Sequence, residues 1–191
     1  MRVACVLVVA ACSHSESKTR RPLDDYGVVP AFTLQDQTDH ALTENWLRGH
    51  VTIVDFVFTR CDTICPALSM KMSHLDEQTQ DLADVRLLSF SVDPKFDTPP
   101  VLATYAAHYG AKPERWRFVT GQYDTVQHLV EGALMSAMED EGKPLPSGAP
   151  DIRHGGHILL IDRDLHIRGV YDSDDAERLD DLVADARTLS R

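Results

Sequence analysis

The residues with the clearest capacity for chemistry are Cys61 and Cys65, within VTIVDFVFTRCDTICP at residues 51–66. If a helix begins near Cys61, the i, i+4 spacing places both thiols on one helix face, about 6 Å apart along its axis. That separation allows either a disulfide or a shared metal ion. The unpaired N–H groups and the dipole at a helix N-terminus favour thiolate over thiol, which predicts a lowered cysteine pKa.

The spacing of the two cysteines favours metal chelation without excluding disulfide exchange. Three residues separate them, whereas the redox C-x-x-C motif has two. Two thiolates suit a soft ion such as Cu(I), while a closed structural zinc site needs four ligands. Both cysteines could instead be small core residues. Their position just beyond a strand end, where α/β folds place their chemistry, argues against that reading.

A third ligand would have to come from elsewhere, and histidine is the commonest candidate. Among nine histidines, His154 stands out because it lies where a Pro- and Gly-rich stretch returns to an apolar strand. His157 is three residues further on and should face the opposite side of that strand, so at most one of the two points at the cysteines. Spacing alone leaves His154 open as a ligand or as an ordinary histidine. Met70 and Met72 are expected to be core or gap-filling residues rather than copper ligands.

The elements that must position these residues alternate between strands and helices. Hydrophobic periodicity predicts an edge hairpin before Trp46, a long exposed loop at residues 139–150, strands at residues 51–58, 85–92, 116–119, 156–161 and 166–171, and helices at residues 66–82, 97–110, 124–135 and 174–189. Such alternation demands a mainly parallel central sheet with flanking helices and an antiparallel C-terminal hairpin. We therefore predict an α/β, thioredoxin-like fold with the cysteines at the first strand–helix junction.

The N-terminus, MRVACVLVVAAC, has the features of an abbreviated bacterial secretory signal. Its end, VAAC, has the form of a lipobox, in which Cys12 becomes the acylated N-terminus and Cys5 is discarded. A plain cleaved signal or a misassigned start are the alternatives. The predicted organisation is a signal peptide at residues 1–11, a lipidated N-terminus and flexible tether at 12–29, and a thioredoxin-like domain at 30–191. The protein would then be a membrane-anchored lipoprotein of the bacterial cell envelope, facing the periplasm.

Composition limits the class of partner. The chain has 191 residues, of which 43% are hydrophobic, enough for one ordinary core. Its net charge of −11 argues against nucleic acid, because a duplex-binding surface needs clustered Lys and Arg.

Four blocks of sequence resemble the Sco/SenC family of copper-binding, thioredoxin-fold proteins. FVFTRCDTICP at residues 56–66 is similar to the family's F-x-F-T-x-C-x-x-x-C-P, and SVDP with DTP at residues 91–99 is similar to S-V-D-P-x-x-D-T-P. WRFVTG at residues 116–121 resembles W-x-F-L-T-G, and residues 154–162 resemble the family's histidine-plus-strand block. The resemblance runs from about residue 30 to the C-terminus and places His154 on the ligand histidine.

The resemblance implies a copper site, for Cu(I) or Cu(II), made of Cys61, Cys65 and His154, with the cysteines also forming a redox-active pair. It implies delivery of copper to the CuA centre of cytochrome c oxidase, or reduction of that centre's cysteines, so the partner is the CuA subunit or another copper or thiol acceptor. The family has a hydroxyl residue after the histidine and often Asp before it, where this chain has Gly155 and Arg153, which predicts weaker metal binding. The alternatives are a thiol-disulfide oxidoreductase or thioredoxin-like peroxidase without a copper role, and a copper or redox sensor.

Overall fold

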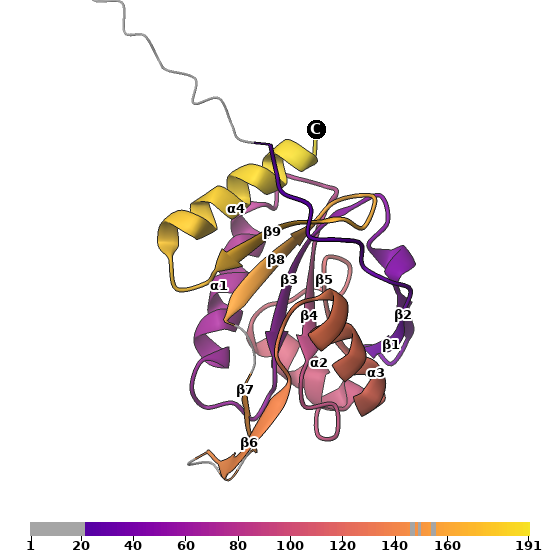
Figure 1. Cartoon of the computed structure of the whole chain (residues 1–191), viewed down its shortest axis with the longest axis vertical. Coiled ribbons are helices and arrows are strands. Elements are labelled where there is room, and N and C mark those ends of the chain that lie inside the picture. The colour runs from indigo at the N-terminus through magenta and orange to yellow at the C-terminus, as the bar shows by residue number, and fades with distance from the viewer. Residues whose placement is uncertain (1–21, 146–147, 149, 154–155) are drawn as a thin grey trace, which may run out of the picture.

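The computed structural model describes residues 22–191 except residues 146–147, 149 and 154–155. Its centre is a seven-stranded sheet in the order β2-β1-β5-β4-β3-β8-β9 (Figure 1). The strands are β1 (Thr33–Asp36), β2 (Ala41–Thr43), β3 (Val51–Val57), β4 (Val85–Ser91), β5 (Trp116–Thr120), β8 (His157–Ile161) and β9 (Ile167–Asp172). β3, β4 and β5 pair in parallel, and the outer strands are antiparallel to their neighbours.

Helices of ten residues or more follow three of these strands, as the alternation in the sequence predicts. They are α1 (Cys65–Gln78) after β3, α2 (Pro99–His108) after β4 and α4 (Ala176–Leu189) after β9. A hydrogen bond of 2.8 Å between the Ser69 and Tyr105 hydroxyls joins α1 to α2, and Lys71 Nζ lies 2.7 Å from Asp174 at the start of α4. α1 is therefore held between α2 and α4.

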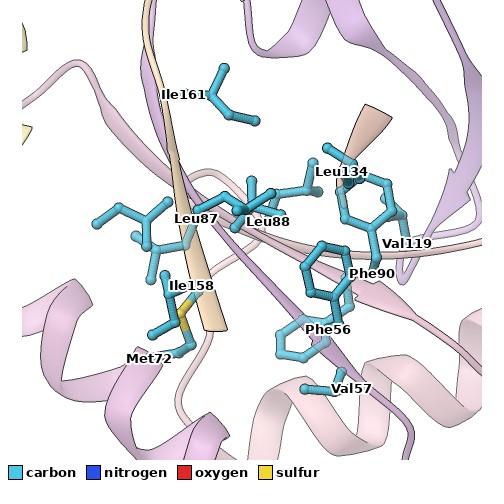
Figure 2. Packing of buried hydrophobic residues seen from close by; sticks show 14 of the residues in the cluster. Phe56, Val57, Met72, Leu87, Leu88, Phe90, Val119, Leu134, Ile158 and Ile161 are labelled. Carbon is cyan, nitrogen blue, oxygen red and sulfur yellow. The ribbon is translucent and has the colours of Figure 1, made fainter. Parts of the chain in front are cut away.

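β3 is the most deeply buried element, and all seven of its residues are buried. Strands covered on both faces read as continuous apolar runs, which is why VTIVDFV predicts a central strand. Phe56 lies opposite Phe90 in β4, and Phe90 lies opposite Val119 in β5. Figure 2 shows these three side chains within the core. Burying each such side chain stabilises the fold by about 1.5–3 kcal/mol, so the end of β3 is a rigid platform for the loop that follows.

Two predicted elements differ from the structure. Residues 139–150 are not a loop, because β6 (Glu139–Pro144) and β7 (Pro150–Arg153) form a separate two-stranded sheet. The register is irregular between Asp140 and Pro144, and Gly142 has φ of 68°, a conformation that glycine adopts without strain. The helix predicted at residues 124–135 is split into α3 (Tyr123–Gln127) and a π-helical segment, η2 (His128–Ala133).

The chain joins the sheet earlier than the predicted boundary at residue 30. Tyr26 and Val29 donate backbone hydrogen bonds of 3.0 and 2.9 Å to Ile167 and Leu165, and Ile167 donates one of 2.8 Å to Gly27. The last residues of the predicted tether, residues 12–29, are therefore paired with β9 and belong to the folded domain. No helix among residues that the structure describes is long and apolar enough to cross a membrane.

Candidate metal site

The structure brings Cys61 and Cys65 together between the end of β3 and the start of α1. Cys65 is fully buried and Cys61 is 7% exposed. The Cys65 backbone N–H donates a hydrogen bond of 3.4 Å to Cys61 Sγ, and the two thiols are hydrogen-bonded to each other. Both are present as thiols. The site therefore contains two buried thiols, of which only Cys61 keeps a small solvent-accessible area.

The two sulfurs do not meet in the predicted way. α1 begins at Cys65 rather than near Cys61, with Pro66 in its first turn. The residue before the helix, Ile64, makes no side-chain capping bond. Cys61 Sγ accepts the hydrogen bond of the first helical N–H instead, a role usually filled by an oxygen of Ser, Thr, Asp or Asn. A loop that folds back onto the helix start, rather than one helix face, therefore brings the cysteines together.

The environment of Cys65 favours the thiol over the thiolate. The hydrogen bond with Cys61 raises the pKa of the Cys65 thiol, and burial and the nearby charge of Asp55 raise it further. The expectation of a lowered pKa is wrong for this residue, because desolvation and the neighbouring sulfur outweigh the helix N-terminus. Metal binding requires deprotonated cysteines, so a soft cation must displace the thiol protons of both Cys61 and Cys65.

Asp97 holds the loop that carries Cys61. It is fully buried, and its carboxylate accepts hydrogen bonds from the Thr59 backbone N–H at 3.2 Å, the Thr59 hydroxyl at 2.5 Å and the Ser91 hydroxyl at 2.6 Å. Burial raises the pKa of Asp97, and these hydrogen bonds oppose the shift. One side chain thus ties the ends of β3 and β4 to the approach to α2. It fixes the loop two residues before the first cysteine.

An ion pair flanks Cys61 on the exposed side. Arg60 donates to Asp93 Oδ2 from Nε at 3.1 Å and from Nη2 at 2.5 Å, and its guanidinium lies 4.2 Å from the centroid of the Phe96 ring. Phe96 and Ile64 are 43% and 47% exposed. The chain next to Cys61 thus carries one ion-paired cation, and Ile64 beside Cys65 presents apolar surface to solvent, which is a surface that another protein can contact.

Asp55 is the ionisable group buried beneath the site. It lies in β3 opposite Ser89 of β4 and has no exposed surface. No hydrogen bond of normal geometry reaches either carboxylate oxygen. Burial raises the pKa of Asp55 to about 7, and the Ser89 hydroxyl partly opposes the shift. Asp55 therefore changes charge in the neutral range, near enough to Cys65 to act on that thiol.

The remaining predicted site residues lie outside the described residues. These are His154 and Cys12, together with Cys5. His157 begins β8, and its ring centroid lies 5.6 Å from that of Phe56. Within the described part of the chain, no group of three or more His, Cys, Asp and Glu side chains could hold a metal ion.

A family model described as SCO1/SenC matches residues 20–190. The chain belongs to the SCO1/SenC family. It is 33% identical to a SCO1 protein homolog of Bacillus subtilis over 185 residues, which covers 96% of this chain and 92% of the relative. It is 30% identical over 146 residues to a protein of Stutzerimonas stutzeri that is named as copper-binding, covering 74% of this chain and 67% of that protein.

Solved structures of SCO1/SenC proteins share the fold, which confirms the predicted thioredoxin-like α/β class. A SCO1/SenC family lipoprotein from Bacillus anthracis superposes with a TM-score of 0.76 at 25% identity, covering 90% of this chain and 99% of that one. BsSco, described as having a disulfide switch and as a member of the Sco family of cytochrome c oxidase assembly proteins, superposes with a TM-score of 0.74 at 28% identity, covering 90% and 96%.

Several residues that shape this SCO1/SenC site were not predicted from the sequence. Asp93 and Asp97 lie in a block that carries the family resemblance, and their fixed spacing from Ser91 is the signal that could have identified them. Asp55 could have been found as the one charged residue inside an otherwise apolar buried strand. A carboxyl in that position is rare unless it is paired or serves a function.

Proposed function

We propose that this protein binds copper through Cys61, Cys65 and His154 and acts in the assembly of the CuA centre of cytochrome c oxidase. It delivers copper to that centre or reduces the centre's cysteines. The observation that carries the proposal is the contact between two buried thiols at the start of α1, of which Cys61 is the more accessible. Two soft thiolates and an imidazole suit Cu(I) and tolerate Cu(II).

Names of relatives support the same role. The Stutzerimonas stutzeri relative is named as copper-binding, and BsSco is described as one of the cytochrome c oxidase assembly proteins. Cys61, Cys65 and His154 fit copper better than zinc, since structural zinc sites use four protein ligands. We treat copper as cargo that is passed on rather than as a resident cofactor.

The direction of β8 supports His154 as the third ligand. β8 runs antiparallel to β3, with Val54 opposite Leu159. His157, the first residue of β8, therefore lies at the end of the sheet where β3 stops and the cysteine loop begins. Figure 1 shows the β6–β7 hairpin projecting from this same end. His154 lies three residues before His157 and directly after β7, close in sequence to both elements.

The test of the proposal is an anaerobic copper titration followed by native mass spectrometry. We expect the reduced protein to bind one tight equivalent and the protein with a Cys61–Cys65 disulfide to bind none at the same concentration, because ligation requires thiolates. Stoichiometric copper in the oxidised protein would contradict the proposal.

Thiol–disulfide exchange is a second candidate, favoured by the direct hydrogen bond between the two thiols. The BsSco structure, described as having a disulfide switch, supports it. Replacing His154 separates the candidates. Exchange with a dithiol substrate should survive His154→Ala, whereas Cu(II) binding should not.

We further propose that the protein is anchored through an acylated Cys12. The lipobox-like sequence and the Bacillus anthracis neighbour, which is a lipoprotein, support this. Cys12→Ser should move the protein from the membrane fraction to the soluble fraction of the expressing bacterium, since stable anchoring needs more than one acyl chain or signal. If the unchanged protein is already soluble, with an N-terminus elsewhere, the anchor does not exist.

A further inference from the structure

The exposed face of α1 carries a methionine that the core does not use. Met72 is fully buried, as the sequence predicts, but Met70 is 67% exposed and the prediction that it packs in the core is wrong. A thioether is polarizable and is the soft, neutral ligand that selects Cu(I) among biological metals. An exposed methionine on a regular helix therefore needs an explanation beyond packing.

His74 lies one helical turn beyond Met70. Residues at i and i+4 are neighbours on a helix surface, the same spacing by which two histidines of one helix hold a metal ion in metalloproteases. Both side chains line a groove of about 320 Å³ between α1 and α4, with Leu75, Leu179 and Asp180 among its other walls. Thioether and imidazole thus face one recess of the surface.

The charges around this groove favour a cation. Lys71 is the one lysine or arginine among the described residues that line the groove. Its Nζ forms an ion pair with Asp174 Oδ1 at 2.7 Å. The Glu77 carboxylate lies 3.8 Å from His74 Nδ1. Metal-binding histidines commonly direct one ring nitrogen to a carboxylate, which orients the ring and raises the basicity of the other nitrogen. Glu77 therefore places a negative charge on the Nδ1 side of the His74 ring, and Nε2 is the nitrogen further from that carboxylate.

We propose that Met70 Sδ and His74 Nε2 form a second, weaker Cu(I) site in the groove between α1 and α4. It depends on none of the residues of the thiol site, so it stands or falls independently of the proposed function. Cys65 and Met70 lie five residues apart on α1, about 7.5 Å along its axis at 1.5 Å per residue. The second site thus lies on the helix that begins with Cys65, and it should bind copper more weakly than the thiols because both of its ligands are neutral.

The test uses the full chain with its four cysteines replaced by serine, so that no thiol competes. Cu(I), supplied anaerobically as its acetonitrile complex, is titrated while the ¹³C-methyl signals of the five methionines are followed by NMR, and Ag(I) serves as a redox-inert second probe. We expect one equivalent to shift the Met70 methyl signal and the His74 ring protons together. Zn(II) should not shift Met70, because a thioether is a poor ligand for it.

Matched variants locate the site. Met70→Leu and His74→Gln should each weaken Cu(I) binding at least tenfold, whereas Met135→Leu, at another exposed methionine, should leave it unchanged. If the four-serine protein does not fold, the same variants are compared in protein that keeps Cys61 and Cys65 and is preloaded with one equivalent of copper. Absence of a Met70 shift, or equal weakening by Met135→Leu, overturns the proposal.

Discussion

Cys65→Ser is expected to lower Cu(I) affinity by about a thousandfold. Changing a residue that only supports a metal ligand typically costs 10–100-fold, and loss of one of two thiolates should cost more. Serine keeps the size of the side chain but offers a hard, protonated oxygen. Cys61→Ser should have a similar effect, because both sulfurs belong to one donor pair. Competition with a chromophoric Cu(I) chelator measures the change.

Thr63→Val is the matched control for these substitutions. Its hydroxyl lies 3.3 Å from Cys61 Sγ, so the change alters the surroundings of the sulfur without removing a ligand and should cost less than tenfold. His154→Ala should weaken Cu(II) binding more than Cu(I) binding, since imidazole is the harder ligand. Wild-type affinity in either serine variant would refute the thiolate site.

The second large effect concerns Asp55 and pH. Asp55→Asn changes the free energy of unfolding of the reduced protein, and this change is expected to be more stabilising at pH 8 than near pH 4 by about 4 kcal/mol. The folded-state pKa of about 7 lies above the usual value of 3.8, so the folded protein holds this proton more tightly than the unfolded chain. The stability from that proton is complete below pH 3.8 and is lost as pH rises to about 7. Three pKa units at 1.36 kcal/mol each give the magnitude.

Urea unfolding of both proteins at several pH values between 4 and 8 measures this difference. Any cost of burying the asparagine amide does not depend on pH and cancels in the comparison. Ser89→Ala removes the hydroxyl that lowers the Asp55 pKa. The pH range over which the free energy of unfolding falls should therefore extend to higher pH. Parallel stability curves for the wild type and Asp55→Asn would show that Asp55 ionises normally.

The sequence was sufficient for the parts of the site that follow from local pattern. A continuous run of apolar, mostly β-branched residues predicts β3. The cysteines directly after it are predicted to lie at the first strand–helix junction, where the structure has them. The contacts of Asp97 could not be predicted in the same way. They join Thr59 to Ser91 across two parallel strands, and no periodicity within one segment reports such a pairing.

The hairpin β6–β7 shows the opposite failure. Its prolines and glycines indicate a loop, yet local backbone pairing between Glu139 and Arg153 suffices to form two short strands. Such a pair needs no alternating apolar face, so hydrophobic pattern carries no signal for it. The exposure of Met70 was missed because a methionine in an amphipathic helix is most often turned toward the core.

The pairing of residues 26–29 with β9 determines how the domain would stand on a membrane. The described chain begins at the end of the molecule near the C-terminus of α4, whereas the β6–β7 hairpin projects from the opposite end (Figure 1). With an anchor at Cys12, a tether of about ten residues would join the lipid to the end of the domain remote from the thiols. At ~3.3–3.6 Å per residue, this tether would be at most ~35 Å long. The cysteines would then face away from the lipid, at a height above the membrane set by the length of the tether and of the domain together.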